Sequence, residues 1–307
     1  MPSTRGGFVA SLSASYEYCR ALHRRHGRSY YLATRLLPAW KRRHVHALYG
    51  FTRYTDDIVD QLETGRGGDA QHRARRLDGW TARFRAGLAG EPTGPDPILP
   101  AVLHTIAVFD LPLADFDAFL TSMRMDLTVR EYQDYSDLLG YMEGSAAVIG
   151  TMMLPVLLAE NRAGRPAADR LAAMREPARQ LGLGFQLTNF IRDVAEDLQR
   201  DRVYLPQRDL DRFGVSRADL AADSAGPAVR ELVRFEIDRA REHYRAAEPG
   251  IALLPPVSQR CIRLAATVYG GILVEIERNG YDVLSRRAVV PRRRRLTAVI
   301  QQLGRPA

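Results

Sequence analysis

Apolar residues along the chain recur every three or four positions, which is the period of an amphipathic α-helix. No segment shows a convincing alternation of apolar and polar residues, the pattern of a half-buried strand. The pattern therefore predicts an all-α protein. The expected helices cover residues 12–25, 41–62, 69–88, 97–109, 113–122, 135–158, 167–200, 227–247 and 259–279.

Proline and glycine interrupt the helical pattern at residues 90–100, 201–216 and 253–258, with shorter breaks at 111–112 and 161–166. None of these breaks is long enough to be a convincing linker between domains, and no repeat of fixed period is present. A chain of 307 residues can bury a sizeable core. We therefore expect residues 1–307 to form a single α-helical domain.

The segment YGFTRYTDDIVD places two aspartates, Asp56 and Asp60, one helical turn apart. Tyr49 and Arg53 fall on the same helical face as this pair. Asp57 points about 100° away from that face and is a weaker candidate for shared chemistry. The segment thus predicts one helical face that carries two carboxylates and an arginine.

A second acidic segment, QLTNFIRDVAEDLQRDRVYLP, begins at Gln186. On a helix, Gln186, Asn189, Asp193 and Asp197 form one polar stripe, because they follow 3-4-4 spacing. Apolar residues occupy the other faces, and Arg192 directly precedes Asp193. A stripe of carboxylates that faces a core needs a partner, since an unpaired buried charge is costly.

Two carboxylates one turn apart can share a hard cation such as Mg²⁺, which prefers oxygen ligands and often bridges carboxylates to substrate phosphates. Facing aspartate pairs on two helices would make a cage for a metal-bound diphosphate, with Arg53 and Arg192 placed to meet its oxygens. The alternative is a pair of solvated helix faces with ordinary Arg–Asp pairs. One such motif alone favours that alternative, whereas two motifs with nearby arginines favour the cage.

Composition indicates an ordinary globular protein, with 46% hydrophobic and 26% charged residues. No apolar run reaches the roughly 18 residues needed to span a bilayer, and the N-terminus lacks the order of a secretory signal. We therefore expect a cytoplasmic protein, with Cys19 and Cys261 as reduced thiols.

The formal net charge is +8, and the basic residues are densest in the C-terminal segment SRRAVVPRRRRL. A solvated tail is the preferred interpretation of that run, and contact with an anionic membrane surface is the alternative. A nucleic-acid binder would spread basic residues along a helical face with interleaved aromatics. We therefore expect no nucleic-acid partner.

At the two acidic segments the chain resembles the squalene/phytoene synthase family, whose members join two prenyl diphosphates head to head. The resemblance extends to HGRSYYLATRLLP at 26–38, YMEGSAAVIGTMMLPVL at 141–157 and VYGGILVEIERNGYDVLSRRAVVP at 268–291, in the family's order. Among members of the family, bacterial phytoene synthases of the actinomycete type resemble the chain most. The resemblance implies a class I isoprenoid synthase fold, a helical bundle with a central cavity.

The resemblance also implies roles for individual residues. The predicted ligands of Mg²⁺, or alternatively Mn²⁺, are Asp56, Asp60, Asn189, Asp193 and Asp197. The residues expected to bind the diphosphate are Arg28, Ser29, Arg53, Gln186, Arg192 and Tyr269. Of these, Arg53, Arg192 and Tyr269 would also act in catalysis, with Tyr141 near the reacting carbons or the final proton loss.

The reaction implied is the condensation of two geranylgeranyl diphosphates through prephytoene diphosphate to phytoene, without NADPH. The same scaffold could take farnesyl diphosphate and form squalene or dehydrosqualene. It could also transfer a short prenyl group to an aromatic acceptor.

The segment GSAAVIG, residues 144–150, has unusually little side-chain volume. It either lets helices approach closely or opens a groove for a long apolar chain, and the groove is the preferred interpretation. His23 and His26 stand three residues apart, a spacing that can hold a metal ion. No third ligand completes such a site, so a structural role is expected for both.

Overall fold

The computed structural model describes residues 11–60, 70–162 and 165–303. Within these ranges the regular structure is helical, apart from one isolated β-bridge between Glu131 and Val203. The prediction of an all-α protein is therefore confirmed. The helices are α1 (Leu12–His26), α2 (Arg28–Thr34), α3 (Ala39–Asp60), α4 (Ala70–Leu88), α5 (Leu99–Phe109), α6 (Leu113–Met125), α7 (Tyr135–Met142), the π-helical turn η1 (Glu143–Ala147), α8 (Val148–Leu158), α9 (Ala168–Arg192), α10 (Val194–Leu198), α11 (Gln207–Phe213), α12 (Arg217–Leu220), α13 (Pro227–Leu253), α14 (Pro256–Arg278) and α15 (Arg292–Leu303).

Most helices lie where the apolar pattern predicts them, and the differences have local causes. The pattern missed the short helices α2, α11 and α12, which have too few turns to display a period. The expected helix at 167–200 is wrong at one point, because α9 ends at Arg192 and α10 begins at Val194. The expected helix ends at 61–62 and 69 lie outside the described residues. The basic C-terminal segment forms α15 rather than a solvated tail.

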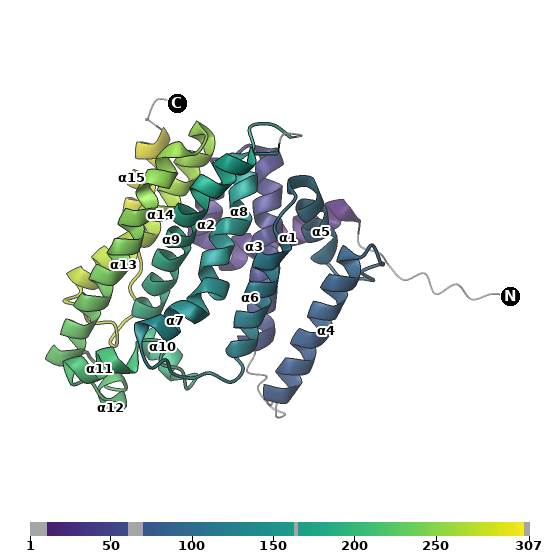
Figure 1. The fold of residues 1–307 in the computed structure, drawn as a ribbon. Helices are drawn as coiled ribbons and strands as arrows, with labels where there is room; N and C mark the ends of the chain where they lie inside the picture. Colours follow the sequence, from purple (N-terminus) through teal and green to yellow (C-terminus); the bar gives the residue numbers. More distant parts are fainter. Residues whose placement is uncertain (1–10, 61–69, 163–164, 304–307) are drawn as a thin grey trace.

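Helix α9 packs against α8, α13 and α14, so it runs through the middle of the bundle (Figure 1). On one side, a core cluster joins α1 to α6 with α8, and large aromatic side chains such as Phe51, Trp80 and Phe116 are fully buried in it. On the other side, a second cluster joins α7, α9, α11, α13 and α14. Burial of this apolar surface is the main term that stabilises the bundle.

The corner between α1 and α2 depends on a glycine. A Cβ atom on Gly27 would lie only 2.7 Å from the Tyr49 ring and 2.8 Å from the His23 ring. Those two rings stack with their centroids 4.0 Å apart. The absence of a side chain at Gly27 therefore lets α2 start directly against α3, and this places the HGRS segment beside the first acidic motif.

The small residues at 144–150 serve both purposes considered for them. A Cβ atom on Gly144 would lie 2.3 Å from the Ala118 carbonyl oxygen, and one on Gly150 would lie 2.2 Å from the Ala178 carbonyl oxygen. These glycines thus allow close approach of α6 and α9. Ser145 and Gly150 also line a cavity. The small residues therefore serve both helix packing and the cavity, whereas the sequence favoured a groove alone.

The π-helical turn η1 lies between α7 and α8 and makes the helical segment 135–158 continuous. By length and composition, this segment could cross a membrane, although the sequence pattern indicated no such segment. In the fold, 78% of its most apolar window is buried inside the protein. The segment 135–158 is therefore a core helix of this bundle.

Candidate active site

An apolar cavity of about 360 Å³ opens into the bundle among α2, α3, α8, α9, α13 and α14. Aliphatic and aromatic side chains make up most of its wall, including Ile149, Met153, Phe185 and Ile262. The predicted site residues Arg53, Asp56, Gln186 and Asn189 line it as well, with Tyr141 further along the wall. The central cavity expected from the sequence is therefore present, and it combines an apolar wall with polar groups from both acidic motifs.

The first acidic motif is held at the end of α3 by arginines. Arg53 pairs with Asp56, with its Nη1 3.1 Å from Oδ2, and also pairs with Asp57. Asp60 accepts a hydrogen bond of 2.9 Å from Arg202, which follows α10 in the chain. The pKa of Asp56 is raised to about 7 by burial and by the charge of Asp60, although its side chain is 38% exposed. Asp56 also lines the cavity, and there burial and the neighbouring Asp60 carboxylate outweigh the opposing effect of Arg53 on its pKa.

The second acidic motif lies on two successive helices, α9 and α10, that meet at Asp193. The backbone leaves the α-helix at Asp193, with φ −103° and ψ 14°. The Asp193 carboxylate accepts hydrogen bonds from Arg192 Nε at 2.7 Å and from Arg287 Nε at 2.8 Å. Burial would raise the pKa of Asp193, but these two guanidinium groups lower it below its ordinary value. Helical hydrogen bonds nevertheless continue across this point, from Asp193 N to Asn189 O at 2.9 Å and from Asp197 N to Asp193 O at 2.8 Å, and the shared face expected for Asp193 and Asp197 stays a prediction.

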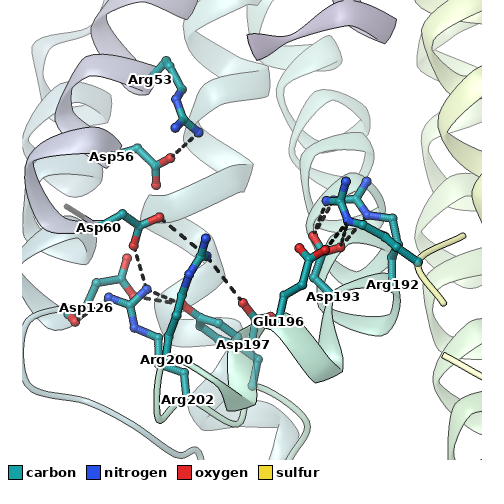
Figure 2. Close-up of polar contacts among 12 residues, drawn as sticks. Arg53, Asp56, Asp60, Asp126, Arg192, Asp193, Glu196, Asp197, Arg200 and Arg202 are labelled. Atoms are coloured by element: carbon teal, nitrogen blue, oxygen red, sulfur yellow. Dashed lines mark hydrogen bonds and ion pairs between the residues drawn. The ribbon is translucent and has the colours of Figure 1, made fainter. Parts of the chain in front are cut away.

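Asp197 lies closer to the first motif than Asp193 does (Figure 2). The guanidinium group of Arg200 lies 4.0 Å from Asp197 and 3.9 Å from Asp60, so it bridges the two motifs. Burial and the charge of Asp193 raise the pKa of Asp197 to about 7. The two motifs thus face each other across a layer of arginine side chains.

A divalent cation fits the donor set of this region. The side-chain oxygen Oδ1 of Asn189 is buried at the cavity wall and has no hydrogen-bond partner among the described residues. An orphaned amide oxygen next to carboxylates of raised pKa is the environment that a hard cation satisfies. Among the described residues, however, no three carboxylate, histidine or cysteine side chains are already gathered around one point. The five predicted ligands therefore stay a prediction, with arginines holding four of them here.

Asp126 is a site residue that the sequence analysis missed. It is 3% exposed and accepts hydrogen bonds from Tyr141 Oη at 2.8 Å and from Tyr204 Oη at 3.3 Å. Arg202 donates to its backbone oxygen at 3.1 Å as well as to Asp60. Burial raises the pKa of Asp126 to about 6 despite the nearby arginine. No acidic neighbour at helical spacing marks this residue in the sequence, so no pattern could have found it.

The predicted tyrosines lie at two different parts of the cavity. Tyr141 is 2% exposed, and its ring belongs to an aromatic group with Tyr132, Phe190 and Tyr204. Tyr269 stacks on Tyr30, with ring centroids 4.4 Å apart. Tyr30 itself lines the cavity.

Four further predicted residues are not part of the cavity wall, namely Arg28, Ser29, Arg192 and Tyr269. Tyr269 also interacts electrostatically with Arg192, which is where a departing diphosphate is expected. Arg28 and Ser29 begin α2 directly before Tyr30, and the Arg28 side chain is exposed. The structure thus brings Arg192 and Tyr269 together next to the lining residue Tyr30, whereas Arg28 and Ser29 stay a prediction.

His23 and His26 do not form a metal site. His23 is buried, and its Nδ1 lies 2.9 Å from Nδ1 of His46. His26 is exposed and lies on the last turn of α1. The structural role expected for His23 agrees with its stacking on Tyr49.

An all-α bundle whose apolar cavity is lined by residues of two acidic motifs on different helices has the architecture of an isoprenoid synthase. The family model for squalene/phytoene synthase matches residues 23–294 of the chain. The 15-cis-phytoene synthase of Synechococcus elongatus is 35% identical over 301 residues, which are 97% of this chain and 96% of that protein. The phytoene synthase of Arthrospira platensis is 37% identical over 292 residues, which are 92% of this chain and 90% of that protein.

Solved structures agree with these relatives. A dehydrosqualene synthase superposes with a TM-score of 0.83 at 26% identity, covering 95% of this chain and 96% of that one. A squalene synthase from Alicyclobacillus acidocaldarius superposes with a TM-score of 0.74 at 29% identity, covering 90% and 98%. The chain belongs to the squalene/phytoene synthase family, and it is a prenyltransferase. The expected similarity to actinomycete enzymes in particular stays a prediction.

Proposed function

We propose that the protein condenses two molecules of geranylgeranyl diphosphate head to head, through prephytoene diphosphate, to phytoene. The observation that carries this proposal is the identity of 35–37% to phytoene synthases over more than nine-tenths of the chain. The apolar cavity with both acidic motifs at its opening supports the same reaction class. The cytoplasmic location expected from the sequence stays part of the proposal.

The residues that would hold Mg²⁺ or Mn²⁺ are Asp56, Asp60, Asp197 and the free Asn189 oxygen, with Asp193 as the further predicted ligand. When bound, such a cation neutralises the charge that develops on the leaving diphosphate. Arg200 and Arg202 hold Asp60 here, so they must give up those contacts when the carboxylates bind another cation.

The chain's own residues supply three contributions to the reaction. Arg53, Arg192 and Tyr269 would bind diphosphate oxygens as the allylic C–O bond breaks, with Gln186 beside them. The apolar wall keeps water away from the allylic cation, so that the double bond of the second substrate captures it.

The same wall would control the end of the reaction. Tyr141, the member of its aromatic group that lines the cavity, would offer its ring to the cations that form in the first coupling and again after the second ionisation. The Tyr141 hydroxyl, which donates a hydrogen bond to Asp126, would take part in the final proton loss. No hydride donor enters this scheme, because proton loss ends it.

A product assay with Mg²⁺ tests this proposal. Purified protein is offered geranylgeranyl, farnesyl and dimethylallyl diphosphate separately, with and without NADPH, and the organic extract is analysed by mass spectrometry. A C40 hydrocarbon from geranylgeranyl diphosphate without NADPH is the expected result. Release of pyrophosphate without a coupled hydrocarbon would refute the condensation and would point to another prenyl acceptor.

The second candidate is the condensation of farnesyl diphosphate to a C30 product. The structural similarity to a dehydrosqualene synthase, at a TM-score of 0.83, favours it specifically. The same assay separates the two, because a C30 product formed preferentially keeps the mechanism and reassigns the substrate. Chain length would then be set by the depth of the cavity.

A further inference from the structure

Helix α15 carries the basic run that the sequence analysis interpreted as a solvated tail or a membrane contact. In the structure it is a 12-residue helix that packs against α14 (Figure 1). Ala298 and Gln302 are buried on its inner face. Arg294 is tied to α14 by an ion pair of 2.6 Å with Glu275. One face of α15 therefore packs on α14, and the opposite face is turned to solvent.

The outer face of α15 carries an apolar stripe. Leu296, Ile300 and Leu303 follow one another at intervals of four and three residues, so they form one stripe. Their exposed fractions are 61%, 60% and 60%. A helix on the surface of a globular protein normally turns its apolar stripe inward. Three large aliphatic side chains aligned on the outer face therefore indicate a surface that binds a partner.

Cations flank this stripe. Arg292 and Arg293 are both exposed at the first turn of α15, and the helix contains no acidic residue. An exposed apolar stripe bordered by arginines is the pattern of a helix that lies in the interface of an anionic bilayer. We propose that α15 binds the surface of a membrane that contains anionic lipids. Its stripe would enter the boundary of the acyl chains, and Arg292 and Arg293 would contact lipid phosphates.

The charges argue against a second copy of the chain as the partner. Pairing of two copies of α15 through this stripe would bring Arg292 and Arg293 of both copies into one interface, and α15 has no acidic residue to neutralise them. Such like charges repel each other, whereas anionic lipid headgroups neutralise them. Nucleic acid would match the cations but would leave the apolar stripe without a role, and α15 contains no aromatic residue for stacking on bases.

The position of α15 relates this surface to the cavity. Ala298 and Val299 pack against the core cluster that includes Cys261 and Ala265 of α14. Cys261 and Ala265 also line the apolar cavity. Helix α14 thus contributes to the cavity wall and also packs against α15. Docking through α15 would bring the apolar wall of the cavity close to the membrane.

Sedimentation with lipid vesicles tests the role of the apolar stripe. The variant Leu296→Ser/Ile300→Ser/Leu303→Ser is compared with Leu113→Ser, which changes an aliphatic residue of similar exposure on α6. The full-length protein is expected to sediment with vesicles of mixed phosphatidylcholine and phosphatidylglycerol. The triple variant should bind at least about tenfold more weakly, because burial of aliphatic groups drives interfacial binding. The control should bind like the unchanged protein.

A second pair of variants tests the charges. Arg292→Gln/Arg293→Gln should weaken binding by about fivefold for each arginine, and the loss should shrink at high salt. Arg24→Gln/Arg25→Gln, which removes two exposed arginines at the end of α1, is the matched control and should bind normally. Vesicles of phosphatidylcholine alone should bind the unchanged protein weakly.

Three results would overturn the proposal. The first is failure of the unchanged protein to bind the anionic vesicles, and the second is an equal loss of binding in the control variants. The third is a concentration-dependent dimer, measured by light scattering, that the triple variant abolishes; this would assign the stripe to a second copy. Circular dichroism and turnover of substrate in the absence of vesicles should be the same in all variants, which confirms that α15 changes only membrane binding.

Discussion

The hydrogen bond from Tyr141 to Asp126 joins a residue of the cavity wall to a buried carboxylate. The two side chains are 2% and 3% exposed, and the Oη to Oδ2 distance is 2.8 Å. Substitution Tyr141→Phe keeps the ring in its aromatic group but removes this donor. The carboxylate would retain only the longer side-chain hydrogen bond from Tyr204, at 3.3 Å. We expect the free energy of unfolding to fall by about 1.5–3 kcal/mol, the usual range for a hydrogen bond to a charged group.

The chain offers a matched control for this variant. Tyr132 is 4% exposed, and its hydroxyl oxygen is buried without a hydrogen-bond partner among the described residues. Tyr132→Phe therefore removes a hydroxyl group from the same aromatic group without removing a hydrogen bond. It should change stability by less than about 0.5 kcal/mol or stabilise the protein slightly, because a buried unsatisfied group is itself unfavourable.

Urea unfolding followed by circular dichroism measures both effects, and a double-mutant cycle with Asp126→Asn isolates the pair. The coupling energy between positions 141 and 126 should be about 1–3 kcal/mol, since residues in contact do not contribute independently. Equal stability losses in Tyr141→Phe and Tyr132→Phe would refute the reasoning. They would show that the hydroxyl groups act through packing alone.

Three further predictions concern the acidic motif, the helix contacts and the dependence on pH. Asp56→Asn should abolish pyrophosphate release while the circular dichroism spectrum stays unchanged; normal turnover would exclude this residue as a metal ligand. Gly150→Ala should cost about 1–3 kcal/mol in thermal or urea unfolding, because its Cβ would lie 2.2 Å from a backbone carbonyl oxygen of α9. Gly79→Ala, with nothing within 4 Å, should be neutral or stabilising, and similar losses in both variants would contradict the packing argument. Burial is the main cause that lowers the pKa of His23 to about 2, that of His44 to about 3 and that of His46 to about 4. Below pH 6.5 the unfolded chain binds protons that the folded chain does not, so stability should fall by about 1.4 kcal/mol per pH unit for each histidine, down to its folded-state pKa. A flat stability profile between pH 6.5 and 4.5 would contradict the neutral state of these side chains.

The apolar period sufficed to predict the helical class because it reports a property that each helix carries in its own sequence. The interruption at Asp193 is different, because the side chain is fixed partly by Arg287, 94 residues further along the chain. No local pattern contains such a contact. The same holds for Asp126, whose role comes from Tyr141, Tyr204 and burial rather than from spacing.

The candidate site could be predicted as a set of residue types but not as an arrangement. Spacing placed Arg53 and Asp56 on one helical face, and the structure shows them paired. Spacing could not show that Arg200 would stand between Asp60 and Asp197. An arginine pairs with these carboxylates only because the tertiary fold brings side chains of several helices together.

The π-helical turn η1 has a consequence for tolerance to insertions and deletions. The i→i+5 hydrogen bonds of a π-helical turn take in one residue more than the i→i+4 bonds of an α-helix, so η1 holds one extra residue inside the helical segment 135–158. Removal of one residue from η1 would let this turn close as ordinary α-helix, and Ile149 and Met153 of α8 would still face the cavity. Removal of one residue from the α-helical part would instead rotate every later side chain by about 100°. The turn is therefore the place in this helix where a change of length alters the cavity wall least.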